Sequence, residues 1–237
     1  MAYLSLFQIK ATHIILRHTV FEGHNQRRFT MSFPQSVLNA PPWNKDKLIG
    51  QKPPLKLEQV WAIRIRLEMA NKLRDLVLFN LAIDSKLRGC DLVKLQVRDV
   101  YRGSESLSRT QVVQQKTKRP VRFEITKKTR NSIEQWIEKT KLKSLDYIFP
   151  CRFKAYPHIS TKQYHSLVHQ WIESIGLDSS AYGTHSLRRT KVALIYKQTK
   201  NLRAVQILLG HTNLESTVRY LGVEVDDALE ISENMEI

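Results

Sequence analysis

Cysteine is nearly absent from this chain, and so are the segments that would carry it into or across a membrane. Its two cysteines, Cys90 and Cys151, lie 61 residues apart, with no Cys-x-x-Cys spacing and no nearby cluster of histidines. This usage favours two reduced thiols over a disulfide or a zinc site. No run of 18 or more apolar residues occurs, which excludes a membrane-spanning helix. Residues 1–10 lack a basic segment ahead of an unbroken apolar stretch, so we expect no signal peptide and predict a cytoplasmic location.

Acidic residues are scarce as well. The chain has 38 lysines and arginines but only 22 aspartates and glutamates, giving a formal net charge of +16 and a pI near 9.9. Six of the acids lie in residues 223–237, which contain no base, so residues 1–222 hold 38 bases against 16 acids. A surplus of that size predicts a polyanionic partner. Charge alone does not distinguish DNA from RNA, nor a nucleic-acid enzyme from a basic ribosome-associated protein.

The first 54 residues are predicted to be an extension without a complete domain of their own. Residues 1–30 show no clear hydrophobic period, so the sequence does not tell whether they belong to the folded unit. Five of the eight prolines lie between residues 34 and 54, and they predict an extended arm because proline interrupts helices and sheet ladders. The lysines of this arm, Lys45, Lys47 and Lys52, suit contacts to a phosphate backbone and equally suit a solvated linker.

From residue 57 onward, the hydrophobic period predicts a mostly helical domain. Two helices are expected within residues 57–83 and a short one within 90–95. Alternating apolar residues predict three antiparallel strands, at 96–101, 110–115 and 121–125. The remaining segments are predicted to be helices, at 126–142, 160–175, 184–199 and 201–209 and around residue 220. The fold class is therefore α+β, mostly α, with a small three-stranded antiparallel sheet.

The helix predicted to begin near residue 184 has the composition of a phosphate-binding site. Thr184 is expected at the N-cap, which places His185 and Arg188 one turn apart on the same face of the first turns. Free N–H groups and the helix dipole favour an anion there, and a guanidinium adds a bidentate donor. The structural alternative is that Arg188 pairs with a buried acid and His185 only caps the turn.

A second group of residues follows about 25 positions later. Gly210 is expected to end a helix, which fixes His211 on a tight corner. Thr212 and Glu215 form a capping-box pattern for the next helix, which carries Tyr220 nine residues after His211. Taken singly, such a tyrosine is usually a core or surface residue, and such a histidine usually a hydrogen-bonding one.

Together, the His-x-x-Arg, Leu-Gly-His and tyrosine motifs resemble the active-site box of the tyrosine recombinase (phage integrase) family. That family also carries an upstream arginine after a helix, which Arg88 in residues 87–92 matches, with Ser85-Lys86 in place of the usual Thr-Gly. Asp91 stands where the family has an acid, and we expect it to orient Arg88. The family's lysine on a β-hairpin corresponds to Lys116.

Four other bases lie close to these motifs. Lys118 and Arg119 share the turn with Lys116, and each suits a plain phosphate contact. Arg189 and Arg219 flank the main motif, and for both a solvated or backbone-contacting base is the expectation.

The resemblance implies a complete set of roles. Tyr220 would attack a DNA phosphate, leaving a 3′-phosphotyrosyl bond and a free 5′-hydroxyl. Arg88 and Arg188 would clamp the non-bridging oxygens, and Lys116 would protonate the leaving 5′-oxygen. His185 and His211 would assist by proton transfer or hydrogen bonding. Since the phosphotyrosyl bond stores the energy of the broken bond, the resemblance implies no metal, no ATP and no other cofactor.

The resemblance also implies the partners and the organisation of the chain. We expect residues 1–54 to be the extension and arm, residues 55–222 the catalytic domain, and residues 223–237 an acidic tail. The partner would be double-stranded DNA, bound by a nucleoid-associated homo-tetramer on two sites, with possible accessory DNA-binding proteins. The tail would dock on a neighbouring subunit or fold back on its own. The alternatives are a type IB topoisomerase-like strand relaxer and a non-catalytic DNA-binding regulator on the same fold.

Overall fold

The computed structural model describes residues 51–153, 155–221 and 233, all of which belong to one compact unit spanning residues 49–237. The expected extension up to residue 50, and the acidic tail apart from Glu233, lie outside the described residues. Residues 51–56 contain neither helix nor strand, and the backbone N–H of Leu55 donates to the Thr190 hydroxyl at 3.0 Å. No helix among the described residues is long and apolar enough to cross a membrane.

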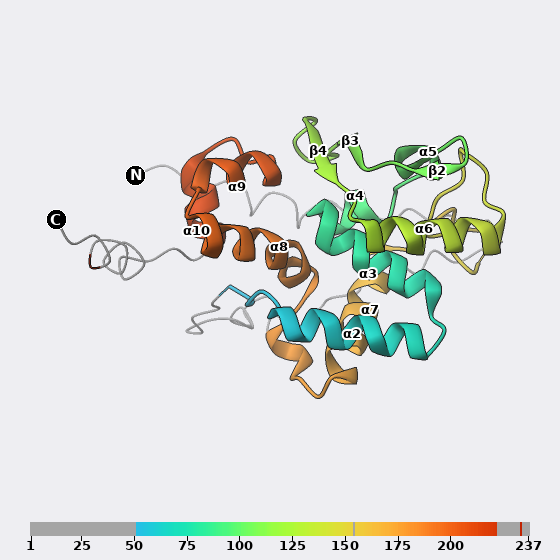
Figure 1. The fold of residues 1–237 in the computed structure, drawn as a ribbon, viewed down its shortest axis with the longest axis horizontal. Helices are drawn as coiled ribbons and strands as arrows, with labels where there is room; N and C mark the ends of the chain where they lie inside the picture. Colours follow the sequence, from blue (N-terminus) through green and yellow to red (C-terminus); the bar gives the residue numbers. More distant parts are fainter. Residues whose placement is uncertain (1–50, 154, 222–232, 234–237) are drawn as a thin grey trace, which may run out of the picture. The chain divides into compact units, whose positions relative to one another are not determined.

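The helix α3 (Leu73–Ser85) is the centre of the main core. Every residue from Asp75 to Ser85 is buried, because α2 (Leu57–Met69), α6 (Lys127–Thr140) and α8 (Thr184–Thr199) all pack against it. Figure 1 shows α3 lying between α2 and α6. On α7 (Thr161–Ser174), Trp171 packs edge-on against Phe79 of α3, with ring centroids 5.5 Å apart. The Ser160 hydroxyl accepts a bond from the Gln163 N–H and caps α7 as its sequence predicts.

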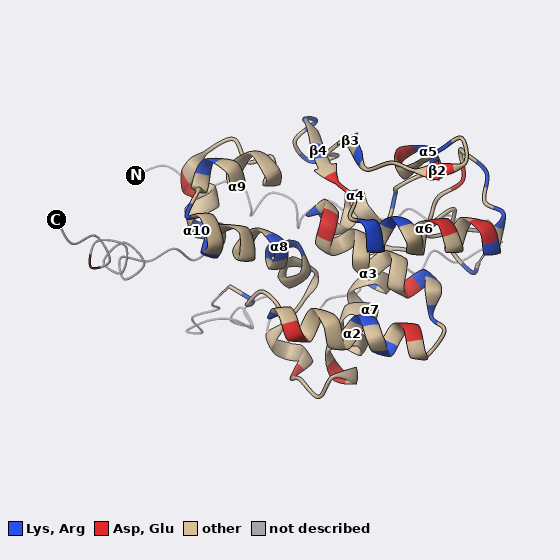
Figure 2. Ribbon diagram, viewed as in Figure 1, with Lys and Arg blue, Asp and Glu red and all other residues tan. Residues whose placement is uncertain are grey.

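The strands form two short antiparallel pairs, so the fold class is confirmed while the single three-stranded sheet is not. Strands β1 (Tyr101–Arg102) and β2 (Glu105–Ser106) make one pair. Strands β3 (Arg109–Val113) and β4 (Pro120–Glu124) make the other, with Gln111 opposite Arg122. The turn between β3 and β4 carries the expected basic residues (Figure 2).

The strand predicted at 96–101 is wrong over most of its length. Residues Val97–Val100 form the single helical turn α5, and only Tyr101 belongs to a strand. The Asp99 carboxylate accepts the Gln96 backbone N–H at 2.9 Å and closes the start of that turn. Val97 and Val100 are both buried, and their spacing of three serves one face of a helix. A window this short does not separate that pattern from alternation.

The last three helices pack on one another around a small separate cluster. They are α8, α9 (Leu202–Leu209) and α10 (Leu214–Leu221). Val192, Val205 and Leu209 are its buried hydrophobic residues in the described chain, and Tyr220 packs against them. Two short elements complete the fold, α4 (Gly89–Leu92) after the α3 corner and the 3-10 turn η1 (Ser179–Ala181) before α8. The fold therefore places Tyr220 against a small cluster at the side of the main core.

Candidate active site

The first turn of α8 begins one residue earlier than predicted. Gly183 occupies the N-cap, and Thr184 is already the first helical residue. The Gly183 N–H donates to the Ser186 hydroxyl at 3.2 Å, a bond that fixes the start of the helix. His185 and Arg188 consequently move one position into the helix. Their spacing of three residues is unchanged, so they still share a face.

Arg188 is buried and held by two backbone carbonyls. Its Nε donates to the Lys86 carbonyl at 2.6 Å and its Nη2 to the Leu209 carbonyl at 2.9 Å. None of the ion pairs in the described part of the chain includes Arg188, so the expected structural alternative is absent there. Burial lowers the pKa of its guanidinium, and the nearby Tyr220 opposes that effect. The side chain is thus oriented by neutral acceptors and keeps its charge available for an anion.

Arg88 precedes α4 and contacts the β3–β4 hairpin. Its Nη1 donates to the Gln114 side-chain oxygen, which also accepts the Thr117 hydroxyl at 2.9 Å. The acid expected to orient Arg88 bonds elsewhere: Asp91 Oδ1 accepts the Gln115 backbone N–H at 2.9 Å. Asp91 therefore anchors the hairpin turn to α4. The side-chain amide of Gln114, and not the predicted Asp91 carboxylate, contacts Arg88.

Lys116 lies exposed in this turn, and no hydrogen bond or ion pair of its side chain occurs among the described residues. The residues before it are firmly held, since Gln115 also donates to the Cys90 carbonyl at 2.8 Å. Lys118 adopts a left-handed conformation with φ 54°, which tightens the turn. The structure thus brings the backbone of Lys116 close to the Arg88 region and leaves its side chain outside the cluster.

Gly210 ends α9 as predicted and sets the position of His211. It has φ 66° and ψ 36°, and a Cβ there would lie 2.5 Å from Val121 Cγ2 of β4. The His211 Nδ1 lies 3.2 Å from the buried Thr217 hydroxyl. Burial lowers its pKa to about 4, with Arg188 and Arg88 contributing further. His211 is therefore neutral at pH 7.

The helix α10 begins at Leu214, directly after Asn213, one residue later than the capping box predicted at Thr212. Its Tyr220 packs edge-on against His211, with ring centroids 5.3 Å apart. The Tyr220 hydroxyl is buried and makes no hydrogen bond of regular geometry in the described structure, although the Arg188 and Arg189 guanidiniums lie close to it. Burial raises its pKa, whereas Arg188 and Arg189 act in the opposite direction. The nucleophile candidate is thus a neutral phenol in a cationic environment.

Arg189 is the residue that the sequence interpretation missed. It is buried, and its guanidinium lies 4.7 Å from the Tyr220 ring centroid, closer than that of Arg188 at 5.4 Å. It donates to the Lys52 backbone carbonyl at 2.5 Å and to the Gln51 side chain, so it is a backbone-contacting base and not a solvated one. The signal was present, because positions 185, 188 and 189 share one helical face. Arg219, by contrast, is exposed as expected.

His185 is exposed at the edge of the same group. Partial burial of its ring is the largest cause of a lowered pKa, and the charges of Arg188, Arg189 and Arg88 lower that pKa further. Five of the predicted residues therefore lie close enough together to interact electrostatically, whereas the Lys116 side chain lies outside this group. We call these five the reacting cluster, namely Arg88, His185, Arg188, His211 and Tyr220.

Another pair of histidines lies on α7, where His165 and His169 approach within 3.0 Å between their Nε2 atoms. Within residues 51–153 and 155–221, no group of three or more histidine, cysteine or acidic side chains gathers as a metal site would. No residue is assigned here to a metal or a cofactor.

Arginines and neutral imidazoles gather around the buried hydroxyl of a tyrosine, an arrangement suited to a protein that handles phosphodiesters. The sequence model of the Phage integrase family matches residues 55–226. The chain belongs to this family, that of the tyrosine recombinases.

Individual relatives agree with that membership. The chain is 29% identical over 175 residues to the probable integrase/recombinase YoeC of Bacillus subtilis (strain 168), covering 74% of this chain and 91% of YoeC. It is 28% identical over 150 residues to a tyrosine recombinase of Pseudothermotoga lettingae, covering 63% of this chain and 50% of that protein.

Solved structures share the fold at low sequence identity. The crystal structure of XerA recombinase has a TM-score of 0.62 at 14% identity, covering 78% of this chain and 65% of that one. The XerH recombinase bound to its difH substrate has a TM-score of 0.61 at 17% identity, covering 79% of this chain and 56% of that one. The chain therefore spans between half and two thirds of the Pseudothermotoga, XerA and XerH proteins.

Proposed function

We propose that this chain is a site-specific DNA recombinase that breaks and rejoins strands through a covalent bond to Tyr220. The observation that carries the proposal is the buried Tyr220 hydroxyl, which makes no hydrogen bond of regular geometry within the described residues although two guanidiniums and a neutral imidazole lie beside it. A buried polar group without a partner is rare in folded proteins and suggests a ligand that completes it. A scissile phosphate between Tyr220 and the arginines supplies that partner.

The chemistry follows from the charges. As the Tyr220 oxygen forms its bond to phosphorus, its proton passes to a neutral imidazole, and His211 and His185 both have lowered pKa values. The bond from phosphorus to the 5′-oxygen breaks, and that oxygen takes a proton from Lys116. Arg88 and Arg188 hold the non-bridging oxygens while negative charge builds on them. Attack of a 5′-hydroxyl on the phosphotyrosine reverses these steps and frees Tyr220.

Lys116 reaches the phosphate only when its side chain turns from solvent toward bound DNA. Gln114 and Gln115, which precede it, bond to Arg88 and to α4, and this attachment supports a role in which the hairpin presents Lys116 to the phosphate. A flexible lysine on a fixed turn suits a proton donor that engages the substrate alone.

The partner in this proposal is double-stranded DNA, on which four copies assemble at two sites. The net charge of +16 supports the first part, and XerH is similar in fold and was solved bound to difH substrate. For the second part, the acidic residues 223–237 would hold neighbouring copies together by docking on basic surface. Mass photometry on DNA with two sites tests this: the full chain forms a four-copy complex, and deletion of residues 223–237 reduces it to one or two copies.

The domain boundaries, 1–54, 55–222 and 223–237, belong to the same proposal, as does a cytoplasmic, nucleoid-associated location. Strand relaxation without exchange, and DNA binding without cleavage, are the competing activities. Neither explains the family membership as well. Supercoiled plasmid with paired sites separates the first, because recombination yields new product circles and relaxation yields only topoisomers.

The direct test uses a pool of duplexes of random sequence, each with one nick a few nucleotides downstream of the variable region and a label on the 5′ end of the nicked strand. Cleavage upstream of the nick releases a short fragment and traps the labelled strand on the protein. We expect a denaturant-resistant adduct with the wild type and none with Tyr220→Phe. Failure of the wild type to capture any member of the pool overturns the proposal.

A further inference from the structure

Lys86 occupies a position that is unfavourable for lysine for two reasons, its backbone conformation and its burial. It caps the end of α3 in a left-handed conformation, with φ 55° and ψ 21°, where side chains other than glycine are strained. Its side chain is also fully buried, which is costly for an ammonium group without a charged partner. A lysine in this setting calls for a compensating interaction.

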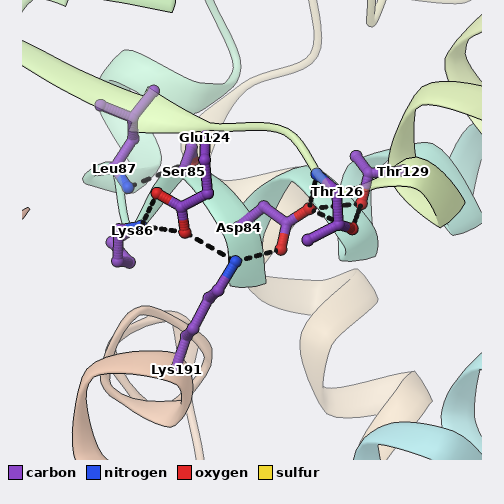
Figure 3. Close-up of polar contacts among 8 residues, drawn as sticks. All are labelled: Asp84, Ser85, Lys86, Leu87, Glu124, Thr126, Thr129 and Lys191. Carbon is purple, nitrogen blue, oxygen red and sulfur yellow. Dashed lines mark hydrogen bonds and ion pairs between the residues drawn. The ribbon is translucent and has the colours of Figure 1, made fainter. Parts of the chain in front are cut away.

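That interaction is a network of four charges, in which Asp84 and Lys86 are buried and the side chains of Glu124 and Lys191 are partly exposed (Figure 3). The Lys86 ammonium contacts both oxygens of Glu124, at 2.9 and 3.0 Å. The Lys191 ammonium bridges Glu124 at 2.7 Å and Asp84 at 2.8 Å. The other oxygen of Asp84 accepts from the Thr126 N–H, the Thr126 hydroxyl and the Thr129 hydroxyl. Two cations and two anions thus balance. We call this set, Asp84, Lys86, Glu124 and Lys191, the charge network.

The charge network joins three segments that carry residues of the proposed chemistry. Lys86 lies two residues before Arg88, and its own carbonyl accepts the Arg188 Nε at 2.6 Å. Lys191 lies one turn after Arg188 on α8. Glu124 ends β4, the second strand of the hairpin whose turn holds Lys116. The same four side chains therefore connect α3, α8 and the hairpin.

We infer that Lys86 is a positioning residue, and that the charge network sets the separation of Arg88, Arg188 and the Lys116 hairpin. This inference rests on the proposed function, because its purpose is to hold a phosphate clamp in place. A paired ammonium in a buried site fixes its neighbours from two directions, whereas glycine at this corner makes no side-chain contact at all. Glycine adopts this left-handed backbone without strain, whereas lysine is held in it by its ion pair with Glu124.

Burial is the largest influence on the Lys86 ammonium and lowers its pKa, while the charge of Glu124 acts in the opposite direction. The pKa shifts of Asp84 and Lys191 favour the ion pairs. Burial acts to raise the pKa of Asp84, yet the charge of Lys191 and the hydrogen bonds outweigh it and lower the pKa. Burial likewise works against the Lys191 ammonium, but Asp84 and Glu124 raise its pKa overall. Both groups are therefore charged at neutral pH, as a network held by ion pairs requires.

The test compares three variants with a matched control, using a duplex recovered by wild-type capture from the nicked pool. Glu124→Gln leaves two ammonium groups with one carboxylate, Lys86→Gly removes one ammonium at a corner that glycine accepts, and the double variant restores charge balance. Arg74→Gln is the control, because it breaks an ion pair at the opposite end of the same helix. All four are assayed at a temperature where circular dichroism shows them folded.

We expect single-turnover cleavage to fall about 100-fold in Glu124→Gln and about 10-fold in Lys86→Gly, since displacing an oriented group by 1 Å costs about that much. The double variant should cleave no worse than Lys86→Gly alone, which marks coupling through the network. DNA affinity should change less than about threefold, because many other contacts hold the duplex. Wild-type cleavage rates in all three variants, or cleavage and affinity falling in parallel, overturn the inference.

A second readout needs no activity. In the DNA-free protein, the Nε–H of Arg188 should exchange slowly with water because the Lys86 carbonyl accepts it. Nuclear magnetic resonance of ¹⁵N-labelled protein identifies the signal by its loss in Arg188→Lys. Protection should drop at least about tenfold in Glu124→Gln and persist in Arg74→Gln. If the wild type forms no adduct, the proposed function fails while this readout still decides the positioning role: unchanged protection in Glu124→Gln refutes it.

Discussion

The charge network and the reacting cluster lie next to each other and differ in how fully their polar groups are satisfied. In the network, every charged side chain has an opposite charge within 3.0 Å. Six buried side-chain atoms lack a hydrogen-bond partner in the described chain. Four of them lie in or beside the cluster, on Asp91, Gln114, Arg189 and Tyr220. Unsatisfied buried groups are costly, so proteins keep them where function uses them.

This difference separates the residues that stabilise the fold from the residues that are proposed to act on DNA. The network is complete without substrate and should contribute to stability. The cluster is incomplete without substrate and should contribute mainly to chemistry. Substitutions within the reacting cluster that lower stability and chemistry together would contradict this separation.

Asp84→Ala should cost the most stability. It leaves the Lys191 ammonium with Glu124 alone and removes the acceptor of three hydrogen bonds at the start of α6. We expect the free energy of unfolding to fall by about 3–5 kcal/mol, as when one partner of a buried ion pair is removed. Chemical denaturation measures it. A loss below about 1 kcal/mol would mean that the network is not a stabilising element.

Arg88→Ala should act on chemistry and spare stability. Cleavage should fall about 10²- to 10³-fold, the usual cost of removing one donor to a developing oxyanion. Duplex affinity should stay nearly intact, because Arg88 would touch one phosphate among many. Single-turnover cleavage and fluorescence anisotropy measure the two quantities. Arg98→Ala removes the same charge from an exposed position and serves as the control. If affinity collapses with cleavage, Arg88 is structural.

Gly210→Ala should affect both stability and chemistry, because the corner that Gly210 forms packs against Val121 of β4 and leads directly into His211. The left-handed backbone and the 2.5 Å approach to Val121 Cγ2 both oppose a methyl group. We expect about 1–2 kcal/mol of lost stability, the penalty for a left-handed side chain. Adduct formation should fall further than that loss explains, since His211 and α10 follow the corner. Thermal unfolding and trapping on the nicked duplex measure the two effects. A Gly176→Ala control changes another left-handed glycine, one whose added Cβ meets no atom within 4 Å.

His211 should produce the smallest effect, a pH dependence of stability. Its pKa is lowered to about 4 in the folded protein, against about 6.5 in an unfolded chain. The unfolded chain therefore binds more protons between these values, and stability falls as pH drops from about 6.5 to about 4. Since the ring is only partly buried, less than about 1 kcal/mol should be involved. His211→Gln should flatten this part of the curve in urea titrations, and an unchanged curve would contradict the shift.

The helix boundaries could be predicted where a local signal encodes them. Ser160 and Gly210 show this, because a hydroxyl three residues before a glutamine and a glycine after an apolar run act within one turn. Val97 and Val100 show the limit, since four residues do not separate a helical turn from a strand. Gly183 shows another, because glycine and threonine both suit an N-cap and the Ser186 hydroxyl decides between them.

In the candidate site, too, some features could be predicted from the sequence and others could not. Five residues predicted from motifs do gather, although their catalytic roles stay predictions. The charge network could not be predicted, because its members at positions 84, 86, 124 and 191 meet only after α3, β4 and α8 have packed. Gln114 was missed for a similar reason: nothing at its own position indicates that Arg88 would donate to it.

The close approach of Gly210 to Val121 also constrains how this protein can change over evolutionary time. Asparagine and aspartate tolerate a left-handed backbone, so they are the accessible replacements at position 210. Either one adds a Cβ only 2.5 Å from Val121 Cγ2, and a smaller residue at position 121 would relieve the overlap. Among the descendants of this sequence, the two positions should therefore covary, although 89 residues of chain separate them.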